Sequence, residues 1–210
     1  MNNKKYISKL RSFFYDDLKD LKNIKILEFG VREGNSTNFF LELCNQNNGK
    51  LYSVDINDCS HLFKNEKWKF IHSSDDNFTK VINESEKEFD LIFIDSFHDP
   101  DHVKKLIFYY FQFLKKNGIM IIDDISWLPY SKNNYRDHFH TEIINRDTFT
   151  EILNILSNNR QIIEVYFSFN DSGLAKIVKR SEEPLKYGKN LINRSFSVKN
   201  IIKKILKKIR

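Results

Sequence analysis

Five short apolar segments of the sequence end in an acidic side chain or are directly followed by one. These acids are Glu28 in ILEFG, Asp55 in LYSVD, Asp75 after WKFIHSS, Asp95 in FDLIFID, and Asp123 and Asp124 in GIMIIDD. A single acid at such a place commonly caps the next helix. Acids contribute little to packing, however, so acids at the ends of five successive apolar segments indicate a ligand site. Carboxylates there could accept hydrogen bonds from ribose hydroxyls or bind a divalent cation.

The segment from Glu28 to Ser36 has a glycine pattern suited to a cofactor. Gly30 and Gly34 allow the backbone to approach a ligand, and Ser36 opens a helix whose N-terminus would face that ligand. The spacing E-x-G-x-x-x-G-x-S is neither the G-x-G-x-x-G of dinucleotide-binding proteins nor a phosphate-binding loop with Lys-Ser/Thr. Asp55 lies 21 residues beyond Gly34, where a carboxylate can hold two ribose hydroxyls. These features together predict a nucleotide-like cofactor.

The elements that must position these residues alternate along the chain. Short apolar runs predict buried strands over residues 24–30, 50–55, 68–74, 89–95 and 118–124. Helical spacing or helix-start signals cover residues 4–22, 36–46, 99–117 and 148–156. Residues 162–169 and 174–180 read as an antiparallel hairpin. The pattern predicts an α/β fold: a doubly wound, mostly parallel seven-stranded sheet with a C-terminal antiparallel hairpin, binding ligands at the carboxyl ends of its strands.

Several segments, in order over residues 24–180, resemble the motifs of one family. ILEFGVREGNST, LYSVD, HSSDDNF, FDLIFIDSFHDPDHV and LKKNGIMIIDD resemble those of class I S-adenosylmethionine-dependent methyltransferases, in particular the small bacterial O-methyltransferase-like branch. The resemblance implies S-adenosylmethionine as cofactor, with contacts from Glu28, Gly30, Gly34, Asp55 and Asp75, beside Ser36 at the helix start. The chain departs from the family pattern at Ser96, where glycine is usual, and at Lys116–Asn117, where Pro-Gly is usual.

The resemblance also implies a metal ion and a base. Members such as catechol O-methyltransferase hold a divalent metal with the fourth-strand acid and a pair after the fifth strand, the positions of Asp95, Asp123 and Asp124. Mg²⁺ there would bring substrate hydroxyls next to the methyl group. His98 stands three residues after Asp95, where related enzymes carry their base, so both residues are candidate catalytic groups. The alternative is that Asp124 caps a loop and His98 orders the turn before Pro100.

The long segment 125–147 contains aromatic side chains, Arg136, His138 and His140. Long loops are often binding loops, and aromatic and arginine side chains suit a sugar or ring. Packing of this segment on the end of the fifth strand is the alternative. His138 and His140 are two residues apart and would point in different directions on a strand, so we expect no zinc pair.

The basic charge is concentrated at the C-terminus. Residues 181–210 carry nine basic and two acidic side chains, so residues 1–180, with 25 basic and 26 acidic ones, have a formal net charge of −1. The pI of about 9.1 therefore comes from the tail, and a nucleic-acid partner is not expected. Residues 197–210 place apolar side chains on one helical face and basic ones on the other. This helix could pack on its own domain, on a second subunit of a homo-oligomer, or on an anionic membrane.

These observations predict three segments: a cap helix over residues 1–23, a cofactor-binding methyltransferase domain over 24–180, and a basic tail over 181–210. No apolar run approaches ~20 residues and no secretory signal is recognisable, so the expected location is the cytoplasm, with contact at the inner membrane face. The predicted activity is O-methylation of a small-molecule or saccharide hydroxyl, assisted by Mg²⁺. The alternative is a non-catalytic cofactor-binding scaffold attached to a membrane. A nicotinamide oxidoreductase is disfavoured by the glycine spacing.

Overall fold

The structure is a computed structural model that describes residues 3–126, 139–192 and 197–208. Its centre is a seven-stranded sheet with the order β3-β2-β1-β4-β5-β7-β6. The strands are β1 (Lys25–Phe29), β2 (Lys50–Asp55), β3 (Trp68–His72), β4 (Phe89–Ile94), β5 (Leu114–Asp123), β6 (Ile163–Ser168) and β7 (Leu174–Lys179). Strands β1 to β5 pair in parallel, whereas β7 is antiparallel to both β5 and β6. The predicted fold, including its C-terminal hairpin, is confirmed.

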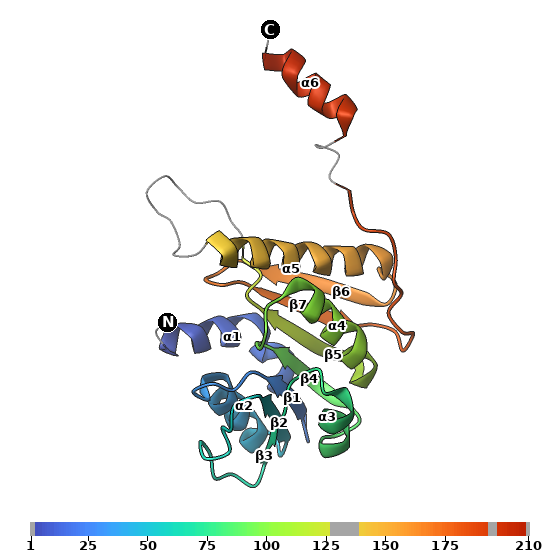
Figure 1. The fold of residues 1–210 in the computed structure, drawn as a ribbon. Helices are drawn as coiled ribbons and strands as arrows, with labels where there is room; N and C mark the ends of the chain where they lie inside the picture. The colour runs from blue at the N-terminus through green and yellow to red at the C-terminus, as the bar shows by residue number, and fades with distance from the viewer. Residues whose placement is uncertain (1–2, 127–138, 193–196, 209–210) are drawn as a thin grey trace.

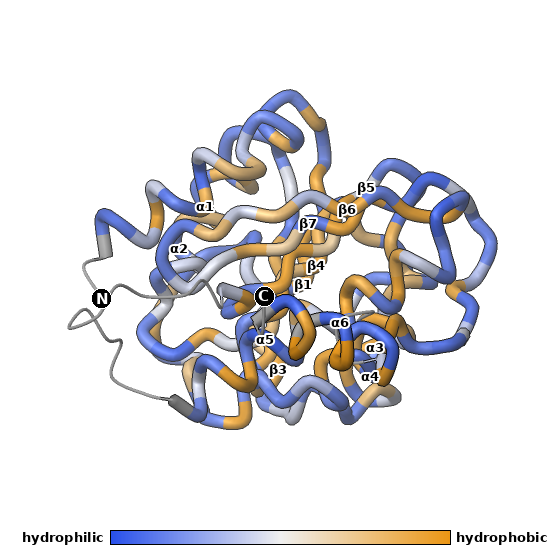
Figure 2. The backbone as a smooth tube through the Cα atoms, turned by 90° about the horizontal axis from the view of Figure 1, so that it is seen from above, coloured by the Kyte–Doolittle hydropathy of each residue, from blue (hydrophilic) through white to orange (hydrophobic). Residues whose placement is uncertain are grey.

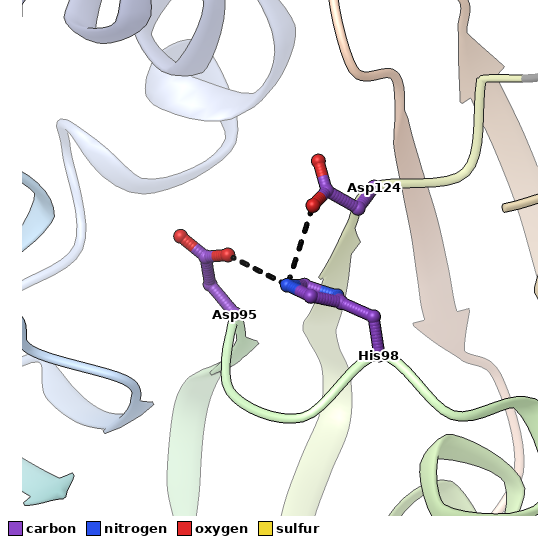
Figure 3. Close-up of side chains that lie close together, drawn as sticks. All are labelled: Asp95, His98 and Asp124. Atoms are coloured by element: carbon purple, nitrogen blue, oxygen red, sulfur yellow. Dashed lines mark ion pairs between the residues drawn. The ribbon is translucent and has the colours of Figure 1, made fainter. Parts of the chain in front are cut away.

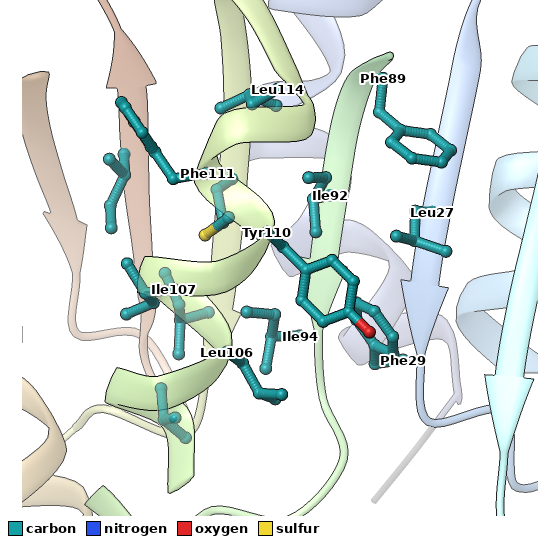
Figure 4. Packing of buried hydrophobic residues seen from close by; sticks show 14 of the residues in the cluster. Leu27, Phe29, Phe89, Ile92, Ile94, Leu106, Ile107, Tyr110, Phe111 and Leu114 are labelled. Carbon is teal, nitrogen blue, oxygen red and sulfur yellow. The ribbon is translucent and has the colours of Figure 1, made fainter. Parts of the chain in front are cut away.

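Helices cover both faces of this sheet (Figure 1). Helices α1 (Asn3–Leu18) and α2 (Asn35–Gln46) pack with one face, and α3 (Phe78–Glu84), α4 (Pro100–Tyr110) and α5 (Phe139–Asn158) with the other. Each face has its own buried core. In the core under α4, the ring centroids of Tyr110 and Phe29 lie 4.6 Å apart (Figure 4). The central strands β1 and β4 are mostly buried and hydrophobic because both faces of the sheet are covered there, whereas the edge strands β3 and β6 are partly exposed (Figure 2).

The N-terminal end of α4 is as the sequence predicts, but its C-terminal end differs. The Asp99 side chain accepts a hydrogen bond from the His102 backbone N–H, and Pro100 is the first helical residue. The helix was expected to continue to Asn117. Instead it ends at Tyr110, a short 3₁₀ turn (Phe111–Phe113) follows, and β5 begins at Leu114. Leu114 pairs with Phe89 across a register shift, so the Asn-Gly pair lies within an irregular strand rather than at a helix end.

The start of α2 also corrects an expectation. Ser36 was expected to open this helix, yet the cap residue is Gly34, with φ of 76°. The hydroxyls of Ser36 and its neighbour Thr37 instead donate to the buried carboxylate of Glu28. That carboxylate needs donors because it is withdrawn from water, so it takes the hydroxyls that would otherwise cap the helix.

Helix α5 begins at Phe139, so the second part of the expected loop, residues 139–147, is helical. Trp127, Tyr130, Tyr135, Arg136 and His138, which the sequence suggested as acceptor contacts, lie outside the described residues. A last helix, α6 (Val198–Lys208), stands apart from the sheet and its helices (Figure 1). Over the described ranges, no helix is both long and apolar enough to cross a lipid bilayer.

Candidate functional site

The predicted acids meet at the carboxyl edge of the sheet, where the strand order reverses between β1 and β4. Two adjoining cavities lie there. The first, of about 260 Å³, extends over the ends of β1, β2 and β4 and is lined by Arg32, Asp55, Ile56, Asp75, Ser96 and Phe97, among others. The second, of about 580 Å³, is lined by Tyr6, Asn35, Ser36, Asp123, Asp124 and Ser172, among others. Gly30 and Asp95 line both cavities, so the two spaces meet between β1 and β4.

Gly30 makes this meeting point possible. Its φ is 90°, and a Cβ at this position would overlap the backbone carbonyl of Asp95. The ends of β1 and β4 can therefore approach only with glycine at this position. From the sequence, Gly30 was expected to allow the approach of a ligand, whereas the contact seen in the structure is with the neighbouring strand end at Asp95.

Glu28 lies beneath the cavities rather than in their walls. Its carboxylate is completely buried and accepts hydrogen bonds from the hydroxyls of Ser36, Thr37 and Ser53 at 2.6–2.8 Å. Burial raises the pKa of Glu28 to about 7, although the three hydroxyls lower it. In the structure, Glu28 therefore positions the start of α2 and the turn above it, and any effect on a cofactor passes through that turn.

Asp55 is held by backbone N–H groups. One carboxylate oxygen accepts from Val31 (2.8 Å) and Arg32 (3.1 Å), and the other from Asn57 (2.8 Å). Burial raises the pKa of Asp55, but these hydrogen bonds together outweigh it, so the pKa lies below its usual value. Asp55 is thus an ionised acceptor with a fixed orientation at the wall of the first cavity.

Asp75 is also fixed by donors. His102 Nε2 lies 2.9 Å from one carboxylate oxygen and the Ser96 hydroxyl donates to the other. Ser96 is one of the departures from the family motif, and this bond gives it a function in the site. The Tyr110 hydroxyl donates to the Asp75 backbone carbonyl at 2.6 Å, so α4 holds the residue from two sides. His102 was not predicted from the sequence as a site residue. Its position three residues after the Asp99 cap is the one feature of the sequence that could have indicated it.

Asp95, His98 and Asp124 come together beside the second cavity (Figure 3). His98 Nε2 lies 3.4 Å from an Asp95 oxygen and 3.3 Å from an Asp124 oxygen. Burial lowers the pKa of His98, but the two carboxylates outweigh burial and raise it. One ligand atom from each side chain lies within 4.8 Å of the others. Side chains from two strand ends thus form one cluster, which could hold a metal ion.

Asp123 points to different partners. Its Oδ1 accepts hydrogen bonds from Lys9 Nζ at 2.7 Å and the Ser172 hydroxyl at 2.9 Å, and the side chains of Asp123 and Lys9 are both almost fully buried. Burial is the largest influence on Asp123 and raises its pKa, and Asp95 and Asp124 add to it, while Lys9 opposes the change. The sequence grouped Asp123 with the metal ligands, but in the structure an ion pair with α1 occupies one of its carboxylate oxygens.

Helix α1 contributes a second contact. The Tyr6 hydroxyl donates to Asp95 Oδ2 at 2.8 Å, and burial together with Asp95 raises the pKa of Tyr6 strongly. The sequence analysis missed Tyr6 and Lys9 as site residues. Lys9 carries a recognisable signal, because it follows Tyr6 by three residues and so lies on the buried stripe of the helix. A lysine on such a stripe requires an acidic partner.

The charges of this region suit a divalent cation. Asp95, Asp123 and Asp124 are close enough that each of the other two raises the pKa of Asp123, and Lys9 supplies one positive charge through its ion pair with Asp123. Lys9 is paired with Asp123, so Asp95 and Asp124 share only the His98 imidazole among the ion pairs of the described residues. Asp95 and Asp124 present oxygen atoms, the ligands that Mg²⁺ prefers. The residues present therefore fit a magnesium ion.

Comparison with known proteins identifies this domain. Residues 27–125, slightly less than half of the chain, match the family model described as a methyltransferase domain. They match a methyltransferase domain, and the chain has the Rossmann-like fold of class I methyltransferases. The match begins in β1 and ends after Asp124, so it includes all the strand-end acids from Glu28 to Asp124. None of the curated proteins compared with the chain matches it.

Solved structures share the fold of this methyltransferase. The methyltransferase PaMTH1 of Podospora anserina, with S-adenosylhomocysteine bound, aligns with a TM-score of 0.61 and 20% identity over 75% of this chain and 72% of that one. An O-methyltransferase of Bacillus cereus, also with S-adenosylhomocysteine, aligns with a TM-score of 0.56 and 15% identity over 84% of this chain and 80% of that one. MycE of the mycinamycin pathway, in complex with Mg, S-adenosylhomocysteine and mycinamycin VI, aligns with a TM-score of 0.60 and 17% identity over 84% of this chain and 50% of that one. This chain therefore spans half the length of MycE. At these identities the likeness shows the fold.

Proposed function

We propose that this methyltransferase transfers the methyl group of S-adenosylmethionine to a hydroxyl of a small molecule or saccharide, with Mg²⁺ bound at the site. The observation that carries the proposal is the convergence of Asp95, His98 and Asp124 beside the second cavity. Binding a cofactor alone needs no such cluster beyond the first cavity. The cluster therefore favours an enzyme over a cofactor-binding scaffold.

The first cavity suits the nucleoside part of the cofactor. The ionised Asp55 would accept hydrogen bonds from the two ribose hydroxyls, and Asp75 lines the same cavity. Ile56 and Phe97 line the same cavity with 68% and 65% of their surfaces exposed. Exposed apolar side chains beside a cavity suit the faces of an aromatic base, so we assign them to adenine. The backbone at Gly30 and Gly34, with Ser36 behind it, then faces the methionine part.

Asp95 and Asp124 would hold Mg²⁺, with Asp123 behind them in its ion pair with Lys9. When bound, the ion would orient the acceptor and lower the pKa of its hydroxyl group. MycE, whose structure contains Mg, shares this fold, which supports the assignment. Tyr6 would fix the orientation of Asp95 through its hydrogen bond to Oδ2.

His98 would receive the proton of the acceptor. Its Nε2 faces the space between Asp95 and Asp124. The acceptor oxygen forms a bond to the methyl carbon as the carbon–sulfur bond breaks. S-adenosylhomocysteine then leaves with the bonding electron pair, and the hydroxyl proton passes to His98 Nε2. Alignment of oxygen, methyl carbon and sulfur is the main contribution of the protein.

The second cavity suits a polar acceptor. Most of its lining side chains are polar, including Tyr6, Asn35, Ser36 and Ser172. It is also the larger cavity and lies on the α1 side of the carboxyl edge. A polyhydroxylated molecule could hydrogen-bond to such a lining with several groups at once, which supports a saccharide or another small polyol as the acceptor class.

Transfer of a labelled methyl group tests this function. The protein should methylate a hydroxyl in a panel of mono- and oligosaccharides and catechols, and chelation of Mg²⁺ should reduce the rate at least tenfold. His98→Ala should lower turnover at least a hundredfold while leaving S-adenosylhomocysteine affinity within a few-fold. Methylation of an amine, full activity after chelation, or no S-adenosylhomocysteine binding at millimolar concentration would contradict the proposal.

A further inference from the structure

Helix α6 presents a complete apolar face without a partner among the described residues. Val198, Ile201, Ile202, Ile205 and Leu206 are exposed over 73%, 42%, 51%, 54% and 58% of their surfaces. At helical spacing they form one continuous face. Figure 1 shows α6 beyond the edge of the domain. A helix of 11 residues is marginal in water by itself, so this face needs a surface on which to be buried.

The contacts of the tail show where it leaves the domain. The Tyr187 ring stacks on Phe108 with centroids 3.8 Å apart. The Asn159 side chain accepts from the Lys186 backbone N–H at 2.7 Å, and the Leu191 backbone N–H donates to Asn154 at 2.8 Å. Residues 185–191 thus form a strap along α4 and α5. Because the domain holds the tail as far as this strap, α6 lies beyond the segment that the domain binds.

The charge of α6 selects among the surfaces that could cover it. The helix contains five lysines and no acidic residue, and the whole tail carries nine basic and two acidic side chains. A second α6 packed on the same apolar face would bring two sets of lysines together with no acid on either helix to pair with them. An anionic lipid surface instead attracts these lysines and accepts the apolar face.

We propose that α6 lies in the plane of an anionic phospholipid bilayer and attaches the methyltransferase to it. The apolar face would enter the boundary between headgroups and acyl chains, and the lysines would contact lipid phosphates. Attachment through a tail beyond the strap leaves the carboxyl edge of the sheet free. The methyl acceptor would then be reached from a membrane-bound position. This inference does not depend on the identity of the acceptor or on the metal.

Co-sedimentation of the full-length protein with lipid vesicles tests the proposal. Vesicles with one third phosphatidylglycerol in phosphatidylcholine should pellet most of the protein at low salt, and phosphatidylcholine vesicles at least tenfold less. Raising the salt concentration to 1 M should release the protein, since screening acts on the charged contacts. No pelleting with anionic vesicles, or equal pelleting with both kinds of vesicle, would overturn the proposal.

Full-length variants assign the binding to α6. Charge reversal at Lys199, Lys203 and Lys207 to Glu, and separately Ile202→Asp with Ile205→Asp, should each reduce binding at least tenfold. The matched control reverses three exposed lysines of the domain, Lys22, Lys50 and Lys64, and should bind as the unchanged protein does. A shorter chain ending at Ile192 keeps the strap and should stay in the supernatant. All variants should keep the thermal midpoint of the original.

Two outcomes would overturn the assignment. Equal loss of binding in the domain control would show that overall charge, not α6, is responsible. A homodimer that both α6 variants convert to monomer, measured by light scattering without lipid, would show that a second copy covers the apolar face.

Discussion

The acids around the first cavity and those around the second differ in the partners of their carboxylates. Around the first cavity, Asp55 is oriented by backbone N–H groups, Asp75 by Ser96 and His102, and Glu28 below them by three hydroxyls. Around the second, Asp95, Asp123 and Asp124 lie close together, with the buried Lys9 paired to Asp123 and His98 between Asp95 and Asp124.

This difference indicates two kinds of ligand. Carboxylates that are fully oriented by neutral donors suit hydrogen bonding to hydroxyl groups of a cofactor. Carboxylates that repel one another store unfavourable charge that a cation relieves. The same residue type therefore performs two tasks in one site, and the donors around each acid decide which task it performs.

The largest effect is expected from Lys9→Met. The substitution leaves Asp123 buried without its ammonium partner, which should lower the free energy of unfolding by about 3–5 kcal/mol. Urea denaturation measures the change. Lys5→Met, which breaks the exposed ion pair with Asp171, is the matched control and should cost less than about 1 kcal/mol. Adding Asp123→Asn to Lys9→Met should recover part of the loss. If Lys9→Met lowers the free energy of unfolding no more than Lys5→Met does, the ion pair of Lys9 with Asp123 does not stabilise the acids around the second cavity.

Glu28 should give the next effect, through pH. Its pKa is about 7 in the folded protein against an ordinary value of 4.5, so the folded state binds the proton more tightly. This contribution to stability is present at pH 4.5 and is lost as the pH rises through 7, by roughly 3 kcal/mol. In Glu28→Gln the free energy of unfolding should therefore fall less over this range. Glu42→Gln, at an exposed position, should follow the unchanged protein. Parallel curves for Glu28→Gln and the original would contradict the assignment.

Ser96→Ala should have the smallest effect. It removes one of the two donors to the Asp75 carboxylate, which should weaken S-adenosylhomocysteine binding by about 1 kcal/mol, or roughly fivefold. Calorimetric titration measures the affinity. Ser74→Ala removes a similar hydrogen bond to the neighbouring Asp76 and should leave affinity unchanged. Equal losses in both variants would show that Ser96 has no specific role.

Much of the fold could be predicted from sequence because its strands are buried on both faces. The stretches LIFI before Asp95 and IMII before Asp123 have no polar interruption, so both their position and their parallel setting were recognisable. The end of α4 was predicted less well. Asn117–Gly118 has the composition of a helix C-terminus, but pairing of Leu114 with Phe89 and the ion pair of Lys115 with Asp90 at 2.8 Å extend the strand to Leu114.

The site was predictable in its acids but not in their partners. The acids follow apolar strands, so their shared edge could be inferred from the order of the chain. Which donor reaches which acid depends on packing between distant segments: Lys9 and Asp123 are 114 residues apart, and Ser96 and Asp75 are 21 apart. No local spacing encodes such pairs, so the partners of Tyr6, Lys9 and His102 could be identified only in the structure.

The most direct test of the division between the two cavities is a calorimetric titration of one protein with two ligands. Asp55→Asn keeps an oxygen for the turn of Val31 and Arg32 but loses the charge, and should weaken S-adenosylhomocysteine binding at least tenfold while Mg²⁺ binding is unchanged. Asp124→Asn should do the reverse, abolishing the Mg²⁺ titration while S-adenosylhomocysteine affinity stays within a few-fold. If either substitution weakens both ligands equally, or neither ligand responds to its own substitution, the account is contradicted.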